Sequence, residues 1–126
     1  NIWDGTDEEG RKCNPHSLQD IRFVKYPSCR GLEGWIAFNH YLDEYWEYLL
    51  AEGKKYYENK IQGSELGGLD SSNDYATNFA AQAILIAFTR GIDEIVISLK
   101  DVDSEIGKKL KLLSDANPGS IEWVLR

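Results

Sequence analysis

The feature of the sequence that most constrains the fold is the alternation of short apolar runs with longer segments whose apolar residues recur at helical spacing. Residues 35–39 form a continuous apolar run, which is typical of a strand buried on both faces. Apolar residues then recur at helical spacing over residues 42–59, and a β-branched run at residues 94–99 predicts another central strand. Strands interleaved with helices in this way predict an α/β fold.

Shorter segments complete the predicted order of elements. Three more strands are expected at residues 2–3, 21–26 and 121–125. A helix from near residue 73 to residue 88 is apolar nearly all round, which indicates packing on several sides, and Gly91 is expected to stop it in a left-handed conformation. A last helix is expected to begin after caps at residues 101–104 and to end at residues 117–119.

The connections between these elements favour a layered, mostly parallel arrangement. Residues 62–68 predict a flexible connection, and residues 70–72 offer amino-terminal caps for the helix that follows. Helical crossovers return the chain to the same sheet edge, so we expect parallel strands in a three-layer α/β/α sandwich. The eight residues between Tyr26 and Trp35 are the exception, because their spacing leaves a hairpin open as well.

Size and composition limit the classes of protein that the chain fits. At 126 residues with 42% hydrophobic residues it is the size of one domain, of which residues 1–20 are the least defined. The formal net charge of −7 argues against nucleic-acid binding through a broad basic face. The sequence has neither a bilayer-spanning run nor a secretion leader, so we expect a cytoplasmic protein with no membrane partner. The chain contains no Met, and we expect it to be part of something longer.

The cysteine and histidine positions give little support for a metal or redox site. Cys13 and Cys29 form no CxxC pair, so two reduced thiols are expected. His40 with Asp43 and Glu44 offers three ligand types, but a solvated helix start is the favoured interpretation of that cluster. We therefore assign no metal ligand in this chain.

Two segments carry chemistry that is unusual for a packed core, although the chain has no phosphate-binding Gly-x-x-x-x-Gly-Lys-Ser/Thr loop. Residues 28–35 place glycines and charges between two apolar strands, where glycine permits close approach to a ligand; a tight solvated turn is the alternative. Residues 84–91 form an apolar helix end with Arg90, whose planar guanidinium suits a phosphate. Stabilisation of the helix dipole is the alternative role for this cation.

These two segments resemble motifs of a helicase family. Residues 28–33, Ser-Cys-Arg-Gly-Leu-Glu, resemble motif V of UvrD-like superfamily 1 helicases, which usually ends Lys-Gly-Leu-Glu. Residues 85–91, Leu-Ile-Ala-Phe-Thr-Arg-Gly, resemble motif VI, usually Tyr-Val-Ala-hydrophobic-Thr-Arg-Ala, and a similar strand follows. The resemblance covers residues 21–99 and implies a RecA-like second motor domain of the P-loop NTPase type.

The resemblance also implies nucleotide-site roles for four residues. Arg90 corresponds to the arginine finger, which reaches the γ-phosphate of ATP bound by a first motor domain and stabilises charge in the transition state. Glu33 corresponds to the motif V carboxylate that faces the nucleotide ribose. Gly31 and Arg30 adjoin it and are assigned to the same nucleotide site.

Contact with nucleic acid is implied less strongly. Lys25 and Ser28 are the residues assigned to single-stranded nucleic acid, yet the family usually has Thr and His before Lys-Gly-Leu-Glu, and Pro27 here offers no side-chain donor. Leu85 replaces the Tyr of motif VI. Coupling to ATP is therefore better supported by the sequence than strand separation.

The sequence as a whole predicts the C-terminal motor-domain fragment of an ATP-dependent, superfamily 1 helicase-like protein. Its partner is an N-terminal motor domain carrying the phosphate loop and the carboxylate that holds Mg²⁺, and the isolated fragment is expected to be inactive. The alternative is a non-catalytic RecA-like protein-interaction module. That interpretation is motivated by an acidic surface and an aromatic helix containing Tyr45, Trp46, Tyr48, Tyr56 and Tyr57.

Overall fold

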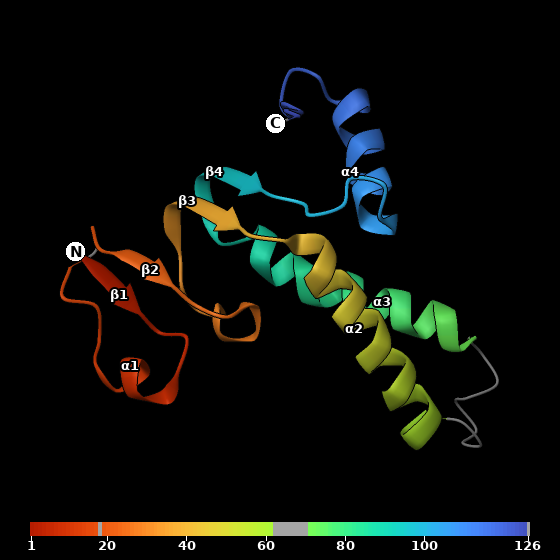
Figure 1. Cartoon of the computed structure of the whole chain (residues 1–126), viewed down its shortest axis with the longest axis horizontal. Coiled ribbons are helices and arrows are strands. Elements are labelled where there is room, and N and C mark those ends of the chain that lie inside the picture. Colours follow the sequence, from red (N-terminus) through yellow and green to blue (C-terminus); the bar gives the residue numbers. More distant parts are fainter. Residues whose placement is uncertain (18, 62–70, 126) are drawn as a thin grey trace.

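The protein is an α/β chain with short strands, long helices and two small parallel sheets. A computed structural model describes residues 1–17, 19–61 and 71–125 (Figure 1). The elements are β1 (Ile2–Asp4), α1 (Glu8–Lys12), β2 (Ile21–Phe23), the 3₁₀ turn η1 (Tyr26–Ser28), β3 (Gly34–Asn39), α2 (Leu42–Tyr56), the π-turn η2 (Tyr57–Ile61), α3 (Ser72–Phe88), β4 (Gly91–Ile97) and α4 (Glu105–Ala116). The predicted connection at residues 62–68 and the predicted cap at residue 70 lie outside the described residues.

The strands form two separate parallel pairs. β1 pairs with β2, and β3 pairs with β4 in a register that sets Gly34 opposite Gly91 and Asn39 opposite Ile97. Parallel pairing across a helical crossover confirms the prediction for β3 and β4. Within the described ranges the strands do not join into one sheet, so a three-layer sandwich is not formed by these residues.

The strand predicted at residues 21–26 is shorter than expected because its end turns into η1. Pro27 has no backbone N–H and a fixed φ, so it suits the first turn of a helix better than a strand ladder. The Tyr26 ring stacks on Tyr45 of α2, with centroids 4.3 Å apart, and its hydroxyl donates to the His40 carbonyl at 2.8 Å. This segment therefore docks onto α2, and no hairpin connects β2 to β3.

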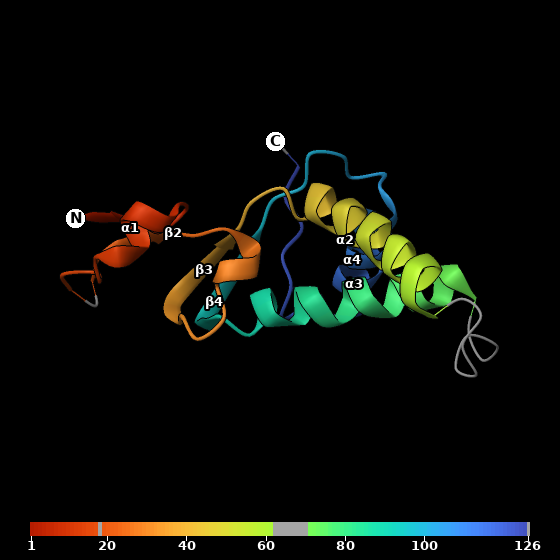
Figure 2. The ribbon, with the colours of Figure 1, turned by 90° about the horizontal axis from the view of Figure 1, so that it is seen from below.

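The core lies where α2 and α3 pack together and α4 closes one end, as Figures 1 and 2 show. Its buried side chains are Leu42, Trp46, Leu49, Ala80, Ile84 and Ile106. Gly53 allows the two long helices to approach closely, since a Cβ there would lie 2.9 Å from the Cα of Ala76. Ser71 caps α3 by accepting a hydrogen bond from the Asp74 N–H at 3.1 Å, as its position predicted.

Hydrogen bonds tie the loop before α4 to α2 and cap the first turn of α4. The carboxylate of Asp43 accepts the backbone N–H groups of Lys100 and Asp101, at 3.0 and 2.8 Å, so it ties the loop after β4 to the start of α2. Ser104 caps α4 through the Gly107 N–H, and the helix ends at Ala116 with Asn117 as its cap, in agreement with the predicted stop at residues 117–119. No described helix is long and apolar enough to span a membrane.

Three sequence-based predictions of local structure are wrong. Residues 121–125 form no strand; Trp123 instead lies beside Lys111 of α4, with the ammonium 5.8 Å from the ring centroid. Gly91 is the first residue of β4; α3 ends at Phe88, and its capping residue Thr89 is not left-handed. The amino-terminal segment contains helix α1, which the sequence analysis missed; Asp7 caps it by accepting the Gly10 N–H at 2.7 Å.

Candidate functional site

The two segments that resemble helicase motifs are in direct contact. The backbone N–H of Gly34 donates to the carbonyl oxygen of Arg90 at 3.0 Å, and an Arg90 Nη1 group donates to the carbonyl of Leu32 at 3.4 Å. Arg90 and Leu32 are 58 positions apart in the sequence. Parallel pairing of β3 with β4 brings them together, so one site contains residues from both segments.

This site lies at the amino ends of β3 and β4. From its sequence, the loop over residues 28–33 is expected at the carboxyl end of a sheet strand, where ligands bind in open parallel sheets. β2 ends at Phe23 and pairs with β1, so the loop precedes β3 rather than completing a strand of the same sheet. The placement argument for that loop is therefore wrong, while the contact with Arg90 holds.

Arg90 is half-buried and held by three hydrogen bonds. Its Nε donates to the Ile86 carbonyl at 3.0 Å and an Nη2 group donates to the Thr89 hydroxyl at 2.9 Å, in addition to the bond to Leu32. A guanidinium has five N–H groups, so two remain for a ligand within the described part of the chain. The other three bonds restrict the side chain, and a restricted guanidinium loses little entropy when it binds an anion.

The loop before β3 is open to solvent and carries both signs of charge. Gly31 has φ of +80°, a conformation that side chains with a Cβ rarely adopt, and the space beside its Cα is empty. Arg30 and Glu33 are both exposed, and neither makes a side-chain hydrogen bond or ion pair with another described residue. An anion or a ribose hydroxyl would find donors and an acceptor here without breaking existing bonds.

Cys29 is a buried thiol that is influenced by both arginines of the site. Burial raises the pKa of its thiol, while the positive charges of Arg90 and Arg30 act in the opposite direction. Both guanidinium groups of the site therefore act on the same buried sulfur. Cys29 and the exposed Cys13 are both free thiols, as the sequence predicted.

The residues assigned to nucleic acid lie just before this loop. Lys25 is exposed and immediately precedes η1. Ser28 is half-buried, and its hydroxyl accepts a hydrogen bond from the Arg11 guanidinium at 3.1 Å, which links the loop to α1. Ser28 therefore has a structural partner that the sequence analysis missed, because α1 was not predicted.

The cluster of His40, Asp43 and Glu44 has partners of its own. His40 Nδ1 lies 3.0 Å from the Ser98 hydroxyl, and Glu44 pairs with Lys100. Burial opposes ionisation of Asp43, but its backbone N–H partners outweigh that effect and hold its pKa below the ordinary value. Among the described residues no three His, Cys, Asp or Glu side chains gather as a metal site.

A cleft of about 300 Å³ adjoins the site and contains Arg30. It lies between η1, α2 and α3, and its walls include Tyr26, Tyr45, Tyr48 and Glu52. The sequence analysis named Tyr45 and Tyr48 as part of an aromatic helix, but it did not predict the cleft. The missing information was the docking of η1 onto α2, which helical spacing alone does not encode.

Comparisons of the chain with protein-family models, with curated proteins and with solved structures each found no match.

Proposed function

We propose that this chain is the C-terminal motor-domain portion of an ATP-dependent, superfamily 1 helicase-like protein. The observation that carries the proposal is the contact between Arg90 and the segment Leu32–Gly34, because it joins the two motif-like sequences into one site. A chance resemblance of two separate segments would not require them to be neighbours. A RecA-like fold for the complete domain is part of the same proposal.

In this proposal Arg90 acts on the γ-phosphate of ATP bound mainly by another domain. The two N–H groups that Arg90 has left would point to equatorial oxygens, whose negative charge increases in the transition state. Arg30, which follows Cys29 in the chain, adds a second cation. The exposed carboxylate of Glu33 accepts from the ribose, and Gly31 leaves the backbone accessible.

The phosphate loop and the Mg²⁺ ligands are assigned to an N-terminal motor domain. The sequence lacks a Gly-x-x-x-x-Gly-Lys-Ser/Thr loop, and the donors of this site are cations and backbone groups rather than Mg²⁺ ligands. ATP and its Mg²⁺ therefore fit between two domains, with this chain supplying charge stabilisation. In the same proposal, Lys25 and Ser28 contact single-stranded nucleic acid. The complete protein is proposed to act in the cytoplasm.

The exposed sheet supports a partner domain or further strands in the complete protein. Trp35 and Phe38 of β3 are 73% and 64% exposed, and Ile92 of β4 is 59% exposed. Large apolar side chains on a two-stranded sheet indicate a surface that is covered by other protein. A RecA-like domain, with several strands and helices on both faces, would cover them.

The test is ATP hydrolysis by the 126-residue chain combined with, or fused to, the motor domain that carries the phosphate loop. Arg90→Ala is expected to reduce the hydrolysis rate by about 10³-fold with little change in ATP affinity. Lys108→Ala on the exposed face of α4 is the control and should hydrolyse ATP normally. Unchanged hydrolysis in Arg90→Ala would contradict the arginine-finger assignment.

A protein-interaction module is the second candidate function. Tyr48 and Tyr56 on α2 are 56% and 49% exposed, so part of the aromatic helix is available to a partner. Tyr45 and Trp46, in contrast, contribute to the internal packing of the helices. Binding of a protein partner by the exposed tyrosines would not depend on an ATP site. Partner binding and a contribution to ATP hydrolysis are therefore compatible in one chain.

A further inference from the structure

Helix α1 contributes an arginine to the loop that precedes β3. The Arg11 Nη1 group donates to the Ser28 hydroxyl oxygen at 3.1 Å, and the Arg11 Nε donates to the Asp7 carbonyl oxygen at 3.0 Å. These two bonds hold the guanidinium against η1. A guanidinium has five N–H groups, so three remain for a ligand within the described part of the chain.

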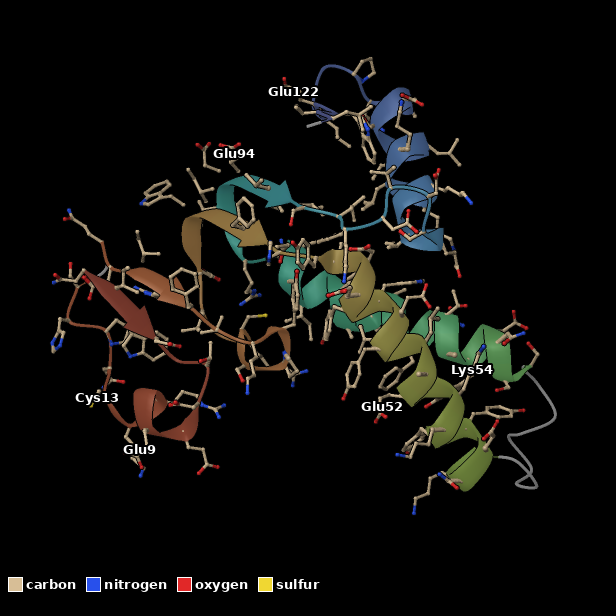
Figure 3. The ribbon with its side chains drawn as sticks, in the orientation of Figure 1. Glu9, Cys13, Glu52, Lys54, Glu94 and Glu122 are labelled. Atoms are coloured by element: carbon tan, nitrogen blue, oxygen red, sulfur yellow. The ribbon has the colours of Figure 1, made fainter. Side chains whose placement is uncertain are left out.

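The charge of Arg11 is not neutralised by the acidic residues of its own helix. Glu9 pairs with Lys12 at 2.6 Å, and Figure 3 shows Glu9 on the side of α1 that faces away from η1. The carboxylate of Asp7 instead caps the helix. Arg11 is exposed and makes no ion pair with any residue that the structure describes. Its guanidinium is therefore available to an external anion.

The hydroxyl group of Ser28 is available as a second donor. Its oxygen accepts the bond from Arg11, and its hydrogen donates to none of the described residues. A hydroxyl oxygen that accepts from a cation becomes a stronger donor through its own hydrogen. Phosphate oxygens accept from hydroxyl and guanidinium groups alike. A phosphate group beside Ser28 would therefore accept from both side chains.

The segment around Ser28 is basic, although the whole chain is acidic. Residues 21–32 contain Arg22, Lys25 and Arg30 and no Asp or Glu, whereas the chain has a net charge of −7. The Lys25 carbonyl accepts the Ser28 N–H at 2.8 Å, so the exposed Lys25 lies one tight turn before Ser28. A polymer with repeated negative charges gains most from several neighbouring cations, because each neutralised phosphate releases a counterion.

We propose that Arg11, together with Ser28, holds a backbone phosphate of single-stranded nucleic acid. This inference rests on the proposed function, which assigns Lys25 and Ser28 to the same strand, and it adds α1 to that surface. A phosphodiester has two free oxygens, which suit one guanidinium and one hydroxyl donor. Contacts of this kind position the strand without reading its bases.

Binding of an oligonucleotide to the 126-residue chain tests the contact. A fluorescein-labelled oligothymidylate of about twelve nucleotides is titrated without ATP at several NaCl concentrations and followed by anisotropy. The slope of log affinity against log salt reports the number of neutralised phosphates. Arg11→Ala is expected to weaken binding about 3- to 10-fold and to reduce the slope by about 0.7, the value for one contact on a single strand. An unchanged slope, or no saturable binding by the original chain at low salt, would overturn the proposal.

Three variants separate a phosphate contact from a structural role of Arg11. Lys12→Ala removes the same charge from the same helix, but this lysine is paired with Glu9, so the slope should stay as in the original chain. Ser28→Ala removes a donor without a charge, so it should weaken binding at an unchanged slope. Arg11→Lys should restore most of the slope that Arg11→Ala loses. Equal slopes in Lys12→Ala and Arg11→Ala would show that net charge alone is responsible and would contradict the contact.

Competition distinguishes a nucleic-acid backbone from a small phosphate ligand. Pyrophosphate at matched ionic strength is expected to displace the oligothymidylate only weakly, because it reaches few of the cations at once. Displacement at pyrophosphate concentrations equal to those of the oligonucleotide phosphates would show a small-anion site, which would overturn the assignment. The assay contains no ATP, so normal hydrolysis by Arg90→Ala would contradict the arginine finger without changing these results.

Discussion

The backbone N–H of Gly34 donates a 3.0 Å hydrogen bond to the carbonyl oxygen of Arg90, at the point where β3 and β4 begin. The same two strands pair Gly34 with Gly91, where a Cβ on Gly91 would lie 2.5 Å from the Glu94 carbonyl oxygen. The position of the arginine is therefore set by a tightly packed strand start. Its side chain then adds bonds to Leu32, Ile86 and Thr89.

This close packing leads to a prediction for Gly91. Gly91→Ala is expected to lower the free energy of unfolding by about 1–3 kcal/mol, because the new methyl group meets backbone that has no space to yield. It should also disturb the contact between Arg90 and Leu32. Urea denaturation gives the first quantity, and Gly119→Ala is the control, since nothing lies within 4 Å of that added methyl. Equal stability of the two variants would contradict the packing.

The contact between α2 and α3 predicts a loss of stability when Gly53 is replaced. Gly53→Val places branched carbon atoms where a single Cβ already lies 2.9 Å from the Ala76 Cα and 3.2 Å from the Phe79 ring. Overpacking of this kind costs about 1–3 kcal/mol, even though valine removes an unfavourable glycine from the helix. Thermal unfolding of Gly53→Val and Gly53→Ala should show a graded loss. A gain of stability in Gly53→Val would mean that the helices do not meet there.

Asp43 predicts a pH dependence of stability. Its pKa is lower in the folded chain than its ordinary value of 3.8, so the carboxylate stabilises the fold above that pH. This contribution is lost as the pH falls through the depressed pKa. Asp43→Asn is expected to lower the free energy of unfolding at pH 7 by about 1–3 kcal/mol, because charge-assisted bonds to Lys100 and Asp101 are weakened.

Denaturation at pH 7 and at pH 2 measures that dependence. The difference between the original chain and Asp43→Asn should become smaller as the pH is lowered from 7 to 2, because the carboxylate takes up a proton as the pH falls through its depressed pKa. Asp93→Asn is the control, because Asp93 is exposed on β4. A difference that stays the same at both pH values would show that ionisation of Asp43 is not the source of the stability.

The two cysteines are expected to react at very different rates. Cys13 is exposed, whereas Cys29 is buried and burial raises the pKa of its thiol, and alkylation requires an accessible thiolate. Iodoacetamide at pH 7.5 should therefore modify Cys13 first, and Cys29 should react only after addition of denaturant. Peptide mass spectrometry assigns each modified site. Rapid labelling of Cys29 in the folded chain would be inconsistent with its burial.

Ser71 predicts a simple helix-cap effect. Its hydroxyl accepts the Asp74 N–H, and Ser71→Ala removes this bond from the start of α3. The expected loss is about 1 kcal/mol in the free energy of unfolding. Ser71→Asp should retain most of the stability, because a carboxylate also caps a helix. Equal losses in both variants would point to a different role for the serine.

The sequence predicts the helices and the β3–β4 pair well because those features depend on local periodicity. Leu42, Trp46 and Leu49 recur at helical spacing and all three are buried. The capping positions Ser71 and Ser104 are likewise local signals. Short elements are less predictable: α1 spans five residues and depends on Asp7, whose acceptor role is visible only once the turn has formed.

The sequence likewise predicts only part of the candidate site. The motif-like segments named Arg90, Arg30, Gly31 and Glu33 from residue type and order alone. Contact between those segments follows from strand pairing, which the sequence predicts for β3 and β4. The cleft between η1, α2 and α3 depends instead on Tyr26 turning away from β2 to stack on Tyr45 of α2. That contact joins residues 19 positions apart in different elements, and no periodic pattern encodes it.

The uncharged strand β3 has a consequence for the behaviour of the chain in solution. Its six residues, Gly34–Asn39, contain no charge and no proline, and most of their apolar side chains are exposed. Such a segment is a template for aggregation, which the net charge of −7 opposes by mutual repulsion between copies. Salt screens that repulsion without covering the strand. Precipitation should therefore begin at lower protein concentration as ionic strength rises, and a charged residue at Ile36 should delay it.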